Sequence, residues 1–360
     1  MELFRQGFEW RRWSVGMVAG LLLGAGAGAA EPPETMRTLS LGEAKKLAFE
    51  RNWDLLAVKA DVDIATAQRL VAGEFPNPNL SVLVGKIQAD GHPAGTSVGN
   101  SFFNRSYDTI AAVSQLLEIG GKRSARQSSA RAGIDGARAR LADARRLLNL
   151  GVTKAYIAVL LADENARVLH DSSASLQREA QIAGDRLKAG DISQADRDQI
   201  QIAADRLALD AQRAEADARG ARIQLEILLG EKEPQGRIAP AEQLTGLAEK
   251  GAGVESTPAG AIVGGRPDVL AARADLRKLE SDLKLARAQR VPDPTVLVQY
   301  EREPPDQPNT VGFGLSFPLP VWNRNRGAIN AVEAARRQAE LNLQKAEAQA
   351  AAEVTLSRHD

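Results

Sequence analysis

The sequence has no cysteine, few aromatic residues and no excess of charge of either sign. Without cysteine there are no disulfide bonds, no thiolate metal ligands and no N-terminal cysteine that could carry a lipid. Aromatic residues make up 4% of the chain, while alanine recurs throughout, which favours close helix packing over a thick globular core. The 46 basic and 46 acidic residues balance, so we expect no nucleic-acid partner.

Long uncharged apolar runs are absent after the N-terminus. At the N-terminus itself, arginines precede the apolar run "VGMVAGLLLGAGAGAA", and the polar stretch "EPPE" follows it. This is the order of a secretory signal. We therefore expect residues 1–30 to be a signal peptide cleaved near Ala29 or Ala30, rather than a retained anchor, which needs about 20 apolar residues. If the exported chain meets a membrane, it does so through strands.

Patterns for catalysis and for metal binding are also missing. The three histidines have no H-x-x-x-H spacing and there are only three methionines, so we expect no metal site and no cofactor. No Walker, dinucleotide or nucleophile motif follows a predicted strand, so we do not expect an enzyme.

Helical periodicity is abundant. Residues 40–73 start with a capping box, Ser40 and Glu43, and predict one helix. Residues 121–188 contain no proline and carry a heptad seam that includes Val152, Val159 and Ala166, which predicts a helix on the order of 100 Å long. Residues 194–229 have a matching seam, so we expect them to return antiparallel to the long helix.

Four short stretches with alternating or β-rich sequence predict two β-hairpins. In the last of them, Val311, Phe313, Leu315 and Phe317 alternate with glycine and serine. Unlike faces of this kind suit a membrane strand with lipid on one side and a lumen on the other, although a soluble hairpin packed on helices has the same pattern. The expected strands are about 79–88, 106–117, 294–303 and 309–319.

The chain contains one structural plan twice. "PNPNLSVLV" at 76–84 corresponds to "PDPTVLVQY" at 292–300, and each follows a helix and starts a strand. We expect a first repeat at 31–229, a connector with little regular structure at 230–265, and a second repeat at 266–360 whose last helix starts at about 326. Four strands are too few to close a barrel, which needs about eight, so several chains would share one.

Five stretches, taken in order, carry a resemblance to a known family. They are "LSLGEAKKLAFERNWDLLAVKADVDIA", "VTKAYIAVLLADENARVL", "RLKAGDISQAD", "RPDVLAARADL" and "FPLPVWNRNRG". Together they make residues 39–358 similar to the TolC-like outer-membrane efflux protein family, and the last stretch is most similar to its heavy-metal, CzcC-like branch.

The resemblance implies a mainly α fold with a small β component: long antiparallel helical hairpins, and two β-hairpins that contribute four strands to a shared trimeric transmembrane β-barrel. It implies a passive channel in the outer membrane of a Gram-negative bacterium, extending into the periplasm, for small substrates that include heavy-metal cations. The implied partners are two further copies of the chain, a periplasmic adaptor protein, an inner-membrane RND-type pump and outer-membrane lipid.

The resemblance also assigns two groups of residues. Adaptor docking and the channel aperture fall on the helical tip, and the change from barrel to helix falls on two junctions. The tip residues are Arg186, Leu187, Gly190, Asp191, Ser193 and Asp196. The junction residues are Gly120, Gly121, Pro318, Pro320, Trp322 and Gly327.

One departure from the family and two rival interpretations stay open. The family has a second tip and return helix, whereas this sequence stops about 31 residues into the helix before it. We therefore expect either a fragment or truncated reading frame, or a defective assembled tunnel. A periplasmic adaptor or scaffolding coiled-coil protein would have one hairpin flanked by compact β-domains instead of two repeats. A soluble structural coiled coil is the third interpretation.

Overall fold

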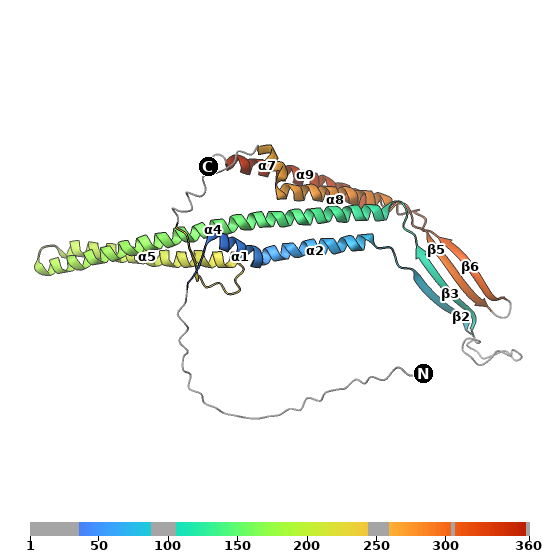
Figure 1. Ribbon diagram of the computed structural model, residues 1–360, viewed down its shortest axis with the longest axis horizontal. Helices are drawn as coiled ribbons and strands as arrows, with labels where there is room; N and C mark the ends of the chain where they lie inside the picture. Colours follow the sequence, from blue (N-terminus) through green and yellow to red (C-terminus); the bar gives the residue numbers. More distant parts are fainter. Residues whose placement is uncertain (1–35, 88–105, 244–258, 304–306, 358–360) are drawn as a thin grey trace, which may run out of the picture. The chain divides into compact units, whose positions relative to one another are not determined.

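The computed structural model describes residues 36–87, 106–243, 259–303 and 307–357. Most of these residues are helical and a minority form strands (Figure 1), which confirms the expected mainly α fold with a small β component. The expected signal peptide, residues 1–30, and the loop at 89–105 lie outside the described residues. No helix of the described part combines the length and the apolar character needed to cross a membrane.

The elements follow one another in the duplicated order of the sequence. Along the chain they are β1 (Arg37–Leu39), α1 (Leu41–Arg51), α2 (Trp53–Gly73), β2 (Asn79–Ile87), β3 (Ser106–Leu116), α4 (Lys122–Ala189), α5 (Gln194–Leu228), β4 (Ile238–Pro240), α7 (Ala259–Gly265), α8 (Pro267–Ala288), β5 (Thr295–Glu303), β6 (Gln307–Ser316) and α9 (Arg326–Leu356).

The helix α4 is the element against which most of the other helices pack. It contacts α1, α2, α5 and α8, and Figure 1 shows α1, α2 and α5 following one another along it. In the half of α4 that runs beside α1 and α5, five of the buried residues are seven positions apart, and three of these five are alanine or serine, which allows close approach of the neighbouring helices. These buried residues are Val152, Val159, Ala166, Ser173 and Ala180.

The expected single helix at 40–73 is wrong in one respect, because Asn52 divides it. Asn52 has an extended backbone and is 5% exposed; its side chain accepts a 2.9 Å hydrogen bond from the N–H of Leu55 and so caps α2. The same side chain donates to the carbonyl of Leu228 at 3.0 Å. The break therefore joins the α1–α2 pair to the end of α5.

The connector at 230–265 has more regular structure than we expected. Its strand β4 pairs in parallel with β1, and α7 lies close to α8 and α9. The carboxylate of Glu226, 3% exposed, accepts four backbone N–H groups of residues 235–238 at 2.5–3.0 Å, which orders the turn before β4. Gly230 has a φ of +79°, and a Cβ there would collide with the carbonyl of Arg51.

A buried tyrosine attaches this small sheet to α4. The hydroxyl of Tyr156, which is 0% exposed, donates to the carbonyl of Leu39 at 2.8 Å and contacts the carboxylate of Glu242. It also accepts from the N–H of Ala241 at 3.1 Å. Burial, and then the neighbouring Glu242, raise the pKa of Tyr156 to about 12, so the phenol stays protonated.

The four longer strands form one antiparallel sheet in the order β2-β3-β5-β6. In its register, Val311, Phe313 and Leu315 of β6 lie opposite apolar residues of β5 and are 65%, 83% and 66% exposed. On the other face, the side chains of Gln299 and Leu297 lie against Gly312 and Gly314. Small residues stand there because the neighbouring strand already fills the space.

The expected strand at 309–319 differs in its bounds. The structure places β6 at Gln307–Ser316, so Phe317 follows the strand and is not part of its apolar face. The prolines at 318 and 320 explain the earlier end, because neither has an N–H to donate to a strand neighbour.

We predict that Asn52→Ala lowers the thermal unfolding midpoint. The substitution removes the cap of α2 and the hydrogen bond to Leu228, a loss of about 1–3 kcal/mol. Circular dichroism of the purified protein in detergent measures the midpoint. Thr66→Ala is the control, because the exposed Thr66 hydroxyl bonds only within its own helix, to the carbonyl of Val62. Equal midpoints for the two variants would contradict the role of Asn52.

Candidate functional site

The helical tip, residues 186–196, is a tight turn between α4 and α5. Gly190 ends α4 with a left-handed backbone, φ +83°, which glycine adopts without strain. The N–H of Gly190 donates to the carbonyl of Leu187 at 3.0 Å, and the N–H of Asp191 donates to the carbonyl of Arg186 at 2.9 Å. Two of the last carbonyls of α4 are thus satisfied within the tip.

A capping box starts α5. The hydroxyl of Ser193 accepts from the N–H of Asp196 at 3.2 Å and donates to its carboxylate at 2.7 Å. The structure therefore brings all six predicted tip residues into one turn. Most of them are exposed, Leu187 being half-buried. Their capping roles are visible in these contacts, whereas docking and aperture contacts stay predictions.

The first junction, residues 117–121, leads from β3 to α4. Gly120 and Gly121 have φ values of +74° and +77°. A Cβ on Gly120 would lie 3.4 Å from the Cβ of Val291, so this turn also passes close to the end of α8. Both predicted glycines are thus favoured by their conformation, and Gly120 also by a close approach.

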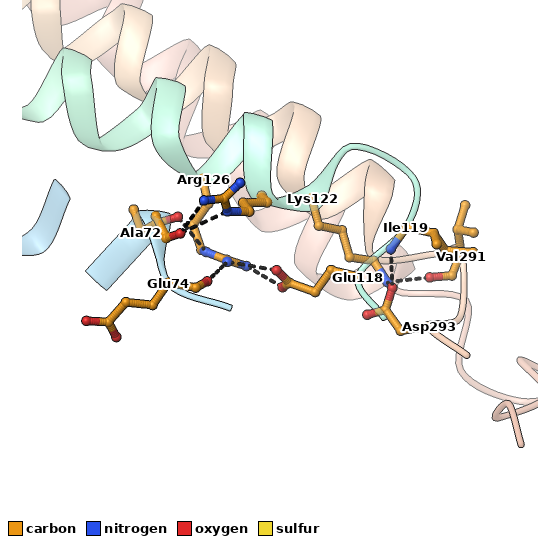
Figure 2. A network of polar contacts seen from close by, with 10 residues as sticks. Ala72, Glu74, Glu118, Ile119, Lys122, Arg126, Val291 and Asp293 are labelled. Atoms are coloured by element: carbon orange, nitrogen blue, oxygen red, sulfur yellow. Dashed lines mark hydrogen bonds and ion pairs between the residues drawn. The ribbon is translucent and has the colours of Figure 1, made fainter. Parts of the chain in front are cut away.

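Lys122 joins this junction to the start of β5 (Figure 2). Its ammonium, on a residue that is 7% exposed, lies 2.7 Å from the carboxylate of Asp293 and donates to the carbonyl of Val291 at 2.6 Å. The same Asp293 carboxylate accepts from the N–H of Ile119 at 2.9 Å. One carboxylate therefore holds both the turn and the first residue of α4.

Arg126 joins the junction to the end of α2 (Figure 2). Its guanidinium contacts both oxygens of Glu118, at 2.6 and 3.0 Å, and donates to the carbonyls of Ala72 and Glu74. The hydrogen bond from Arg126 lowers the pKa of Glu118 below its ordinary value of 4.5. We call Glu118, Lys122, Arg126 and Asp293 the junction network.

Sequence reasoning missed the junction network. Lys122 and Asp293 are 171 positions apart, and nothing local to either residue indicates the pairing. A signal was nevertheless present: the repeat aligns "PNP" at 76–78 with "PDP" at 292–294, and the only change is the carboxylate that the network uses.

The second junction, residues 317–325, leads from β6 to α9. Pro318, Pro320 and Trp322 are exposed there. The left-handed residue before α9 is Asn325, with φ +54°, while Gly327 is already the second residue of the helix. The side-chain amide of Asn325 donates to the carbonyl of Ala286 at 2.8 Å. Asn325, which the sequence analysis did not single out, thus does the work of a capping glycine.

No group of three or more histidine or carboxylate side chains positioned to hold a metal ion is found among the residues that the structure describes.

The structure thus joins a long helical hairpin, α4 and α5, through tight turns to a four-stranded sheet whose apolar face is exposed. The sequence pattern of the family described as "Outer membrane efflux protein" matches residues 45–231 and 261–357. The chain therefore belongs to the outer membrane efflux protein family. This confirms the expected function, a channel component of tripartite efflux systems, and the expected location in the outer membrane and periplasm.

One relative and several solved structures can be compared with the chain. The relative is the "Cobalt-zinc-cadmium resistance protein CzcC" of Cupriavidus metallidurans, 28% identical over 305 residues that cover 83% of this chain and 67% of CzcC. A crystal structure of CusC has a TM-score of 0.68 at 18% identity, covering 92% of this chain and 77% of CusC. The Campylobacter jejuni CmeC outer membrane channel has a TM-score of 0.65 at 18% identity, with 90% and 72% covered. These structures share the fold.

We predict that Glu118→Gln destabilises the protein at neutral pH by about 1–3 kcal/mol, because the charged hydrogen bonds to Arg126 are weakened. Since the folded pKa of Glu118 is lowered, its contribution is complete above pH 4.5 and is lost as the pH falls through the folded pKa. The difference between the variant and the unaltered protein should therefore shrink below pH 4.5. Thermal unfolding midpoints at a series of pH values measure it.

Glu164→Gln is the matched control, because Glu164 pairs with Arg167 on the exposed surface of α4 at 2.5 Å. An exposed pair contributes little, so this variant should unfold like the unaltered protein. A deficit of Glu118→Gln that stayed constant from pH 7 to pH 3 would contradict the assignment of the charge to the junction network.

Proposed function

We propose that three copies of the chain close one twelve-stranded β-barrel. The four-stranded sheet has β2 and β6 at its edges, and neither edge pairs with another strand of the described residues. Strand directions alternate from β2 to β6, so β6 of one copy can pair antiparallel with β2 of the next, and three times four strands make a closed ring. Closure satisfies the backbone groups that open edges would leave unpaired in lipid.

The single observation that carries this proposal is the exposed apolar face of the sheet. A soluble sheet buries such a face, whereas a membrane barrel turns it to lipid. The opposite face offers serine, threonine, glutamine and glycine to a lumen, and it also carries the large apolar residues Leu83, Ile110, Leu116 and Leu297. The exposed apolar residues that share one face are Leu80, Val82, Val113, Val296, Val298, Tyr300, Val311, Phe313 and Leu315.

The helical tip would then meet the other parts of an efflux system. We propose that residues 186–196 dock onto a periplasmic adaptor, which connects the channel to an inner-membrane RND-type pump. The caps at Gly190 and Ser193 satisfy the backbone within the turn and leave charged side chains exposed for a partner.

The proposed cargo is a divalent heavy-metal cation. Support comes from the similarity to CzcC, whose name describes cobalt, zinc and cadmium resistance. We propose that the channel is a passive conduit, with the driving force supplied by the pump.

We predict that Phe313→Arg abolishes the trimer. An arginine facing lipid near the bilayer midplane costs about 2–4 kcal/mol, and each trimer would carry three. The measurement is the heat-modifiable trimer band of the outer-membrane fraction on denaturing gels. Gln299→Arg is the control, since Gln299 lies on the opposite face of the same sheet. A trimer of Phe313→Arg as abundant as that of the control would argue for a soluble sheet.

We predict that Asp191→Arg weakens adaptor binding about tenfold, the loss of one interface contact of roughly 1.4 kcal/mol. Co-purification of the adaptor and cellular tolerance to cobalt, zinc and cadmium measure it. Asp217→Arg makes the same charge change at an exposed position of α5 away from the tip and should behave like the unaltered protein. Unchanged adaptor recovery with Asp191→Arg would remove this residue from the docking surface.

A further inference from the structure

The two strand-to-helix junctions share a backbone plan but differ in charge. Both end in a left-handed residue directly before a long helix, so their residues correspond when counted from the first helical position. The corresponding pairs are Glu118 and Trp322, Gly120 and Arg324, Gly121 and Asn325, Lys122 and Arg326, and Arg126 and Asn330.

The first junction neutralises its cations internally, and the second does not. Lys122 and Arg126 lie 2.7 and 2.6 Å from carboxylates. Across the described ranges, neither Arg324 nor Arg326 forms an ion pair, and both are exposed. Each guanidinium therefore keeps a full set of donors, in the planar arrangement that matches a phosphate group.

The second junction is also hollowed and apolar at its edge. Trp322, Asn323, Arg324, Arg326 and Gly327 line an open hollow of about 370 Å³. Trp322 is 95% exposed, and Leu319 and Val321 are 70% and 57% exposed. These residues directly follow β6, and the exposed Phe313 of β6 belongs to the face proposed to meet lipid. The two arginines and Trp322 therefore lie where the surface of the membrane would begin.

The repeat also indicates what the next copy would place beside this junction. Asp293, which neutralises the first junction, stands two residues before β5, the neighbour of β3. The corresponding residue of the first repeat is Asn77, two residues before β2. In the proposed ring β2 of the next copy is the neighbour of β6, so an amide replaces the carboxylate. Asn77 of the next copy would therefore not neutralise the charge of Arg324 and Arg326 after assembly.

We infer that Arg324, Arg326 and Trp322 bind the phosphate headgroup of an anionic phospholipid in the membrane leaflet that faces the periplasm. The arginines take the phosphate, and Trp322 lies at the level of the headgroups. The occupant is a phospholipid and not a free phosphate, because Leu319 and Val321 offer apolar contact to acyl chains beside the cations. The inference rests on the proposed function, since it needs the barrel to be in a membrane.

The test measures how much each lipid stabilises the purified full-length trimer in detergent. Phosphatidylglycerol should raise the thermal unfolding midpoint more than phosphatidylcholine does, and Arg324→Gln with Arg326→Gln should remove this difference. Arg206→Gln with Arg337→Gln is the control of equal charge change, since both are exposed and without an ion pair among the described residues. The control should keep the preference for phosphatidylglycerol.

Three results would overturn the inference while leaving the proposed function intact. The first is a heat-modifiable trimer with no preference between the two lipids. The second is equal stabilisation by inorganic phosphate. The third is that Glu74→Gln lowers trimer stability as much as the double arginine variant does, while both variants keep the preference for phosphatidylglycerol. That result would mean that the arginines pair with a carboxylate of the next copy and not with a lipid. Absence of any trimer of the unaltered chain would overturn both proposals.

Discussion

The pairing of β3 with β5 is the constraint on which the rest of the structure depends. Each β-hairpin forms between strands that follow one another, but this pairing joins the two repeats, from Thr109 opposite Arg302 to Leu116 opposite Thr295. Because β3 leads into α4 and β5 follows α8, the same pairing sets α8 against α4. The contacts of Ser129 with Asp282 at 2.5 Å and of Arg140 with Asp275 at 2.9 Å continue the alignment along both helices. It also makes β2 and β6 the outer strands.

Most helices and strands could be predicted because their signals are local and repeated. A heptad seam fixes α4 over many turns, and alternation fixes the strands. The break at Asn52 could not be predicted, because the helical pattern runs on across it and one decisive partner, the carbonyl of Leu228, is 176 positions away. The strand β4 is three residues long, too short to show any period, and depends on the carboxylate of Glu226.

The candidate site divides in the same way. Gly190 and Ser193 carry the ordinary signals of helix ends, so the tip was visible in the sequence. At the second junction, the prolines and Trp322 were recognised, but a glycine was expected near the start of the helix, and this led to Gly327 where the structure uses Asn325 as the left-handed residue. The junction network was not predicted because a charged residue on a helix is usually exposed to solvent. Only the fold shows that Lys122 is buried beside Asp293.

The proposed ring would explain why the first junction pairs its cations with carboxylates while the second leaves its cations exposed. Both partners of the first junction belong to one chain, so Lys122 can be buried as soon as the chain folds. The second junction stands at the outer strand β6, which pairs with β5 on one side, so a strand on its other side would have to come from another copy. A buried cation waiting there without its carboxylate would cost several kcal/mol, whereas exposed arginines stay hydrated and cost little before assembly. Exposed cations beside an open edge are therefore an arrangement that both the single chain and the proposed membrane-bound ring would tolerate.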